Sequence, residues 1–188
     1  MVYVKKSELV KPTEIEYDEI LQICQDLFEK KNKDYGTSWR ILRLPSITDQ
    51  LFIKAQRIRT IQEKGVQRVE DDVSTEFVGL INYCLMALIQ LDGLPMDLDT
   101  DSLTTAYRGQ VSAVKRLLFD KNHDYGEAWR EMRVSSMTDI ILMKLLRIKQ
   151  IEDNAGLTLV SEGVTSGYQD IINYAVFCLI LSNGLKTN

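Results

Sequence analysis

The chain has 188 residues, of which 45% are hydrophobic and 27% charged, and its net charge at pH 7 is −4. This size and composition suit one domain or two small ones with a sizeable core. The negative charge argues against nonspecific nucleic-acid binding, which needs a broad basic surface, and no apolar run approaches the roughly 20 residues of a membrane-spanning helix.

The first predicted helix begins at Thr13, which has the spacing of a capping box to Glu16. Apolar residues follow at helical intervals. The helix is expected to end where Gly36 follows Asp34 and Tyr35, because glycine tolerates the left-handed backbone that closes many helices.

The second predicted helix begins at a capping signal formed by Ser46 and Asp49, and ends at Gly65. One row of residues steps along it by four and three, as a packed seam does. The row is Ile47, Leu51, Lys54, Ile58 and Ile61. Lys54 therefore places an ammonium group in a row of aliphatic side chains, and Arg57 follows it on the same face.

An unpaired ammonium in such a seam costs several kcal/mol, so Lys54 needs a negative partner unless its chain reaches out to solvent. One alternative is a structural salt bridge to Asp34, Asp49 or Glu76. The other is an anionic ligand, which Lys54 and Arg57 would grip as a phosphate site.

The third predicted helix runs from about Ser74 to Leu91 and is apolar on nearly every face, as a central bundle helix is. Within it, Asn82 must find a hydrogen-bond partner if it is buried. Residues 94–101 are predicted to be a short acidic linker, and Ser102 to cap the next helix.

The whole three-helix pattern then occurs again. Residues 31–61 match residues 121–151 at 15 of 31 positions, and the third helix matches a segment from about Thr165 to Leu181 after one inserted residue. We predict an all-α fold with repeats at residues 1–93 and 102–188. Packing about a pseudo-twofold axis would bury both third helices together, as a homodimer does, and further oligomerisation stays open.

The duplicated polar residues form two predicted anion pockets. The expected phosphate-binding residues are Lys31, Arg40, Lys54 and Arg57, with Lys121, Arg130, Lys144 and Arg147 as their counterparts. Asp34 and Asp124 are the candidate general bases or metal ligands, although an aspartate near a helix end often bonds backbone amides instead.

Aromatic and amide side chains would support these pockets. Tyr35, Trp39, Tyr125 and Trp129 could stack on a base or belong to the core, and Asn82 and Asn173 could orient site residues or tie helices together. Ser136 and Asp139 repeat the second-helix cap, and Gly126 and Gly156 the helix ends. The cysteines Cys24, Cys84 and Cys178 are expected to be buried free thiols.

The strings Lys-Asn-x-Asp-Tyr-Gly, Lys-x-x-Arg and Asn-Tyr resemble the nucleotide modification associated domain 1 family over both repeats. This resemblance implies a helical domain linked to nucleotide metabolism or DNA modification, without an established reaction. The helical outline is also similar, more distantly, to the all-α nucleoside triphosphate pyrophosphohydrolases of the MazG type, which hold Mg²⁺ with two pairs of carboxylates.

This chain departs from the carboxylate pairs of those hydrolases. Lys54-x-x-Arg57 and Lys144-x-x-Arg147 stand where the first acidic pair is expected. The second pair is split between the repeats, because one has Glu76 followed by Gly79 and the other has Gly167 followed by Asp170.

The expected function is therefore binding of a nucleotide or related phosphorylated small molecule, with phosphate-ester chemistry and Mg²⁺ as a candidate cofactor if the protein is an enzyme. The alternative is a noncatalytic helical module whose duplicated charges form structural salt bridges. No secretory signal is evident at the start of the sequence, so a cytoplasmic location is expected.

Overall fold

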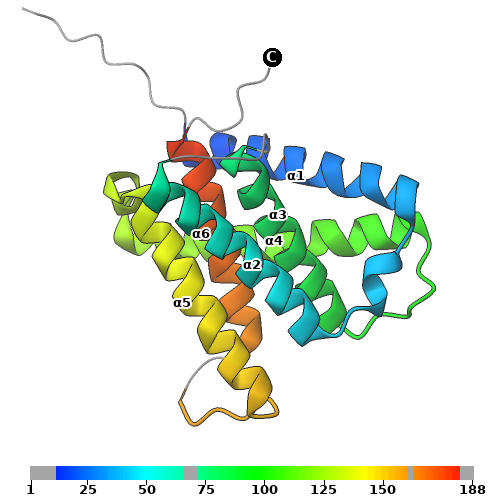
Figure 1. The fold of residues 1–188 in the computed structure, drawn as a ribbon. Coiled ribbons are helices and arrows are strands. Elements are labelled where there is room, and N and C mark those ends of the chain that lie inside the picture. The colour runs from blue at the N-terminus through cyan, green and yellow to red at the C-terminus, as the bar shows by residue number, and fades with distance from the viewer. Residues whose placement is uncertain (1–11, 66–71, 161–162, 183–188) are drawn as a thin grey trace, which may run out of the picture.

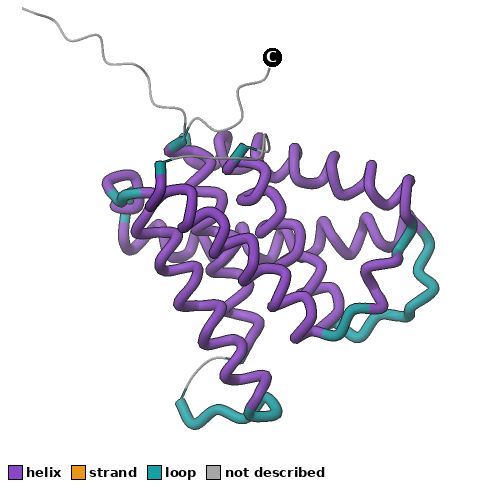
Figure 2. The backbone as a smooth tube through the Cα atoms, in the orientation of Figure 1, coloured by secondary structure: helices purple, strands orange, loops and turns teal. Residues whose placement is uncertain are grey.

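The computed structural model describes residues 12–65, 72–160 and 163–182, and it leaves the side chains of residues 121–125 undescribed. In chain order the elements are α1 (Thr13–Tyr35), η1 (Ser38–Ile41), α2 (Leu44–Lys64), α3 (Val73–Leu91), α4 (Thr100–Tyr125), η2 (Ala128–Glu131), α5 (Val134–Asp153) and α6 (Val164–Leu181). Figure 2 shows helices joined by loops, with no strand in the ranges described. The predicted all-α fold is confirmed.

The helices form three layers of two. α3 and α6 pack against each other in the centre, α2 and α5 lie side by side over one face of this pair, and α1 and α4 cover the other face (Figure 1). Each layer thus takes one helix from each repeat. The predicted pseudo-twofold bundle follows from this arrangement, and it buries both apolar third helices together.

Contrary to the expectation from the sequence, the two central helices are long and apolar enough to cross a membrane by length and composition alone. In α3, 61% of the apolar stretch is buried inside the protein, and in α6 50% is. Burial of this kind is what core helices of a folded domain show.

The predicted ends of α1, α2 and α4 at glycines are confirmed. Gly36 and Gly126 follow α1 and α4 with φ of 61° and 60°, and Gly65 follows α2 with φ of 62°. α5 is the exception, because it ends at Asp153, before Gly156.

α1 begins at Thr13, as predicted, but Thr13 does not cap it. The predicted starts at Ser46 and Ser136 are wrong, because α2 begins at Leu44 and α5 at Val134. No side chain caps α1, α2 or α5, whose N-cap positions are Pro12, Arg43 and Arg133. α2 begins earlier than expected because a proline fits the first helical turn, where its missing N–H needs no partner. The prediction that Asp49 and Asp139 cap their helices is therefore also wrong.

Ser102 does not cap α4 either. Asp99 holds that position, and its carboxylate accepts hydrogen bonds from the Ser102 N–H at 2.7 Å and the Ser102 hydroxyl at 2.9 Å. α4 begins at Thr100, so the last residues of the predicted linker are already helical.

Buried hydrogen bonds join the two repeats in a symmetric exchange. Tyr17 of α1 donates its hydroxyl to Asn173 of α6 at 2.7 Å, and Tyr107 of α4 donates to Asn82 of α3 at the same distance. Asn82 also donates to the Cys24 carbonyl at 3.1 Å. The asparagines therefore tie helices together, which was one of the two predicted roles.

A second symmetric set joins α2 to α5. Thr48 donates to Glu152 at 2.8 Å, and the matching Thr138 accepts from Gln62 at 3.0 Å. Asp49 pairs with Lys149, and Asp139 with Arg59 at 3.7 Å. The two aspartates that had been expected to cap helices instead bridge the repeats.

All three cysteines are free and buried, as predicted. Burial raises the pKa of Cys24 and of Cys178 to about 12, which keeps both thiols neutral.

Candidate functional site

In the first repeat, one carboxylate meets both cations of the Lys-x-x-Arg pair. Lys54 Nζ lies 3.0 Å from Glu76 Oε2, and Arg57 donates to Glu76 Oε1. Lys54 comes from the middle of α2 and Glu76 from the first turn of α3, so the packing of these two helices places them. Of the predicted partners for Lys54, the structure selects Glu76.

The charge balance around Glu76 is visible in its pKa. Burial alone would raise the pKa of this carboxyl, but Lys54 and Arg57 together hold it below its usual range. Glu76 is therefore a buried carboxylate that stays ionised between two cations.

The second repeat arranges the same cations differently. Lys144 of α5 pairs with Asp170, which lies one turn further along α6 than the position that matches Glu76. Arg147 is exposed, and among the described residues it has no ion-pair or hydrogen-bond partner. The two repeats thus share a cation pair but differ in what neutralises it.

A cavity of about 270 Å³ lies beside these cations at the start of α6. We call it the α6 cavity, and its described lining is Lys144, Arg147, Ile148, Ile151, Val160, Gly163, Ser166 and Gly167. Gly163 is the N-cap of α6, and the first turn of this helix contains no acidic residue. Free backbone N–H groups and the helix dipole make such a terminus favourable for an anion.

A neighbouring cavity of about 290 Å³ adjoins the α6 cavity and shares Arg147, Ile151 and Val160 with it. Its remaining lining is Gln150, Asn154, Leu157, Thr158 and Leu159. We call it the outer cavity. It combines aliphatic walls with amide and hydroxyl groups, whereas the α6 cavity contributes the cations.

Arg40 does not join the Lys54 site. It is 3% exposed, and its Nη2 donates to the carbonyls of Leu94 and Pro95 beyond the end of α3. Glu76 lies at the opposite end of that helix, because the 15 residue steps from Glu76 to Leu91 span about 22 Å at about 1.5 Å per residue. Arg40 instead holds the linker against the bundle.

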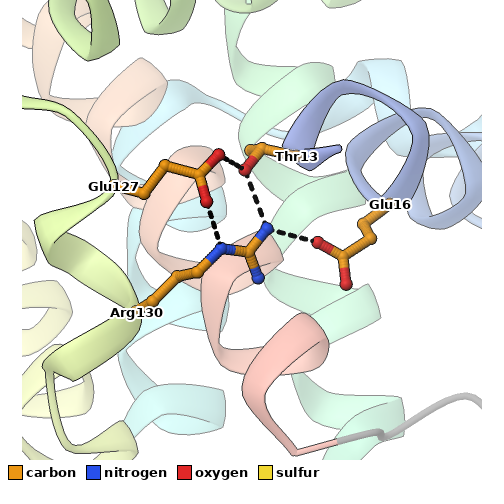
Figure 3. Close-up of polar contacts among 4 residues, drawn as sticks. All are labelled: Thr13, Glu16, Glu127 and Arg130. Carbon is orange, nitrogen blue, oxygen red and sulfur yellow. Dashed lines mark hydrogen bonds and ion pairs between the residues drawn. The ribbon is translucent and has the colours of Figure 1, made fainter. Parts of the chain in front are cut away.

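Arg130, the counterpart of Arg40, belongs to a cluster that joins η2 to α1 (Figure 3). It donates to Glu16 at 2.6 Å and to the Thr13 hydroxyl at 2.8 Å, and it also pairs with Glu127. Thr13 donates to Glu127, and this bond and Arg130 together lower the pKa of Glu127 against the effect of burial. These contacts fasten the start of α1 to the second repeat.

The Asp-Tyr-Gly turn of the first repeat is not brought to Lys54 by any described contact. Lys31, Asp34 and Tyr35 are exposed at the end of α1, and Tyr35 is 71% exposed. The predicted roles of Lys121, Asp124 and Tyr125 fall on side chains outside the described residues.

The two tryptophans pack in the core. Trp129 stacks on Phe177 with ring centroids 4.1 Å apart, and Trp39 packs against Phe28 at 6.2 Å. Their predicted role in stacking on a base has no support from these contacts.

Three further residues contribute to the fold or to the site and were not identified from the sequence. Tyr17 and Tyr107 hold the buried asparagines, and their match at the 90-residue spacing could have identified them. Gly163 could not have been recognised, because its importance depends on where α6 begins.

The described residues place no group of three or more His, Cys, Asp and Glu side chains where they could hold a metal ion together. The carboxylate set expected of a Mg²⁺ site is therefore not assembled in the part of the chain that is described.

A model of the family described as nucleotide modification associated domain 1 matches the chain twice, at residues 31–91 and 121–181. The two matches coincide with the two repeats. No curated protein and no solved structure matches the chain significantly. The more distant resemblance to the MazG-type pyrophosphohydrolases stays a hypothesis.

Proposed function

Because the chain belongs to the nucleotide modification associated domain 1 family, with one copy of the domain in each repeat, we propose that it binds the phosphate group of a nucleotide or related phosphorylated small molecule. The phosphate site is the α6 cavity, and Arg147 and Lys144 are its cations. The remainder of the molecule would lie in the outer cavity, where Gln150 and Asn154 offer hydrogen-bonding groups beside aliphatic walls.

One observation carries the proposal. An arginine without a described partner and a lysine line a cavity at a helix N-terminus that has no acidic side chain in its first turn. Arginine suits phosphate because its planar guanidinium can donate two parallel hydrogen bonds to phosphate oxygens. The site can therefore receive an anion without losing an existing contact of Arg147 to the described residues.

The proposal is one of binding. General acid–base chemistry needs a titratable group within hydrogen-bond reach of the reacting atoms, and Asp34 has no described contact with either cation pair. No step is assigned to Mg²⁺, since the described residues do not form a carboxylate set for it.

Thermal unfolding in the presence of inorganic phosphate and of nucleoside mono-, di- and triphosphates tests the proposal, with and without Mg²⁺. We expect at least one of these compounds to raise Tm, and the Arg147→Ala variant to lose most of that increase. Arg116→Ala removes an exposed arginine of α4 away from both cavities and is the matched control, which should keep the increase.

A lysine variant is a poorer test, because Lys144→Ala also removes the ion pair between Lys144 and Asp170, so a change of Tm would not report on the ligand alone.

The alternative function is a noncatalytic helical module. It is favoured by the ion pairs of Lys54 and Lys144, which give both lysines a structural explanation. If no phosphate compound changes Tm, and Arg147→Ala behaves as the unmodified protein does throughout, the module is the better account.

A further inference from the structure

The two repeats have exchanged an acid and a glycine on their third helices. α3 and α6 correspond at a spacing of 91 residues, so Glu76 matches Gly167 and Gly79 matches Asp170. Each helix therefore keeps one acid and one glycine, three residues apart on one face, in opposite order.

In the first repeat this order puts the carboxylate in the first helical turn. Glu76 lies there between Lys54 and Arg57. Gly79 makes the arrangement possible, because a Cβ atom at this position would lie 3.1 Å from both Cδ and Cε of Lys54. Lys54 thus crosses the space that a side chain at residue 79 would need.

In the second repeat the first turn carries no side chain at the matching position. Gly167 lines the α6 cavity together with Lys144 and Arg147, so the cavity lies where the Glu76 side chain lies in the first repeat. Lys144 turns toward Asp170 instead.

We propose that Glu76 is a built-in anion that occupies the phosphate position of the first repeat, so that the chain binds a single phosphate group, in the second repeat. This inference rests on the proposed function and specifies it further. The ligand group is a tetrahedral phosphate that replaces, in the second repeat, the carboxylate that the first repeat supplies from its own chain.

The test follows the Nε–Hε signals of Arg57 and Arg147 by NMR while inorganic phosphate is added to ¹⁵N-labelled protein. In the unmodified protein the Arg147 signal is expected to shift and the Arg57 signal to stay, because Glu76 already holds Arg57. In the double variant Glu76→Gly/Gly79→Asp, which copies the order of α6 into α3 at constant net charge, both signals are expected to shift.

Two controls accompany this test. Glu63→Gln removes an exposed acid of α2 that pairs with Arg59, and it should leave the Arg57 signal unresponsive to phosphate. If the double variant does not fold, Glu76→Gln removes the competing charge with little change of shape, and the Arg57 signal should then respond.

The possible outcomes separate the inference from the function on which it rests. A shift of Arg57 equal to that of Arg147 in the unmodified protein overturns the inference and leaves phosphate binding intact. So does an Arg57 signal that stays fixed in the folded double variant, or in Glu76→Gln, while Arg147 shifts. If neither arginine responds in any variant, phosphate binding fails and the inference fails with it.

Discussion

Glu152 is a partly buried carboxyl group whose surroundings disfavour its charged form. It accepts hydrogen bonds from Thr48 at 2.8 Å and from Tyr168 at 3.2 Å, between α5, α2 and α6. Burial raises its pKa above the usual range, although the bonds from Thr48 and Tyr168 oppose the shift. The matching position in the first repeat is Gln62, an uncharged side chain that donates a hydrogen bond to Thr138.

Glu152→Gln should therefore gain stability relative to the unmodified protein as the pH rises. The folded state holds the Glu152 proton more tightly than the unfolded state does, so this residue contributes stability below its unfolded pKa of 4.5 and loses it as the pH rises through the higher folded pKa. Urea unfolding of both proteins between about pH 4 and pH 8 measures the difference. A difference in unfolding free energy that does not change with pH would contradict the assignment.

At the scale of the helices, Gly79 and Gly167 differ in what surrounds them. Gly79 faces the flexible end of Lys54, but a Cβ at Gly167 would lie 2.9 Å from both Cγ1 and Cδ1 of Ile148. Ile148 is 1% exposed, so a Cβ at residue 167 would force a packed side chain to shift. Gly167 is thus required for the close approach of α5 and α6.

Gly167→Ala should be less stable than Gly79→Ala by about 1–3 kcal/mol, the usual cost of overpacking a core. Both substitutions gain the same helix propensity, so the comparison cancels this term. Chemical denaturation gives the two free energies, and adding Ile148→Val to Gly167→Ala should recover part of the loss. Equal stabilities of the two alanine variants would show that the α5–α6 contact is not tight.

The helices also show how far the sequence can be interpreted alone. Apolar periodicity predicted the fold class, the match of the sequence to itself predicted the duplication, and glycines predicted the ends of α1, α2 and α4. The start of α2 was missed because Ser46 has capping spacing, while Pro45 fits the first helical turn. The capping role of Thr13 was missed because its hydroxyl instead contacts Arg130, far away in the sequence. The need of Lys54 for a negative partner was predictable, but its choice among nearby acids depends on how α2 packs on α3.

At the scale of the whole molecule, the repeats are interlocked rather than adjacent. α1 of the first repeat packs on α6 of the second, α4 packs on α3, and the central α3–α6 contact belongs to both (Figure 1). A single repeat would expose the apolar faces that this contact buries. A chain of about half this length buries too little other apolar surface to offset that exposure.

Dividing the chain within the linker should therefore give two halves that fold only together. Residues 1–96 and 97–188, expressed from one plasmid, are expected to purify as a one-to-one complex with the helical content of the intact protein, because the break falls between α3 and α4. Size-exclusion chromatography with light scattering and circular dichroism are the measurements. Either half purifying alone as a folded monomer would contradict the interlocked arrangement.

The crossed tyrosine–asparagine bonds restrict how the duplicated gene can diverge. Loss of the Tyr17 hydroxyl would remove its hydrogen bond to Asn173 of the other repeat, so a mutation in one repeat changes the stability of the other. Positions whose side chains bond to the other repeat therefore form epistatic pairs, in which the effect of a mutation at one position depends on the residue at the other. Glu76 and Asp170 each form an ion pair with a lysine of their own repeat, and at these positions the two repeats have diverged.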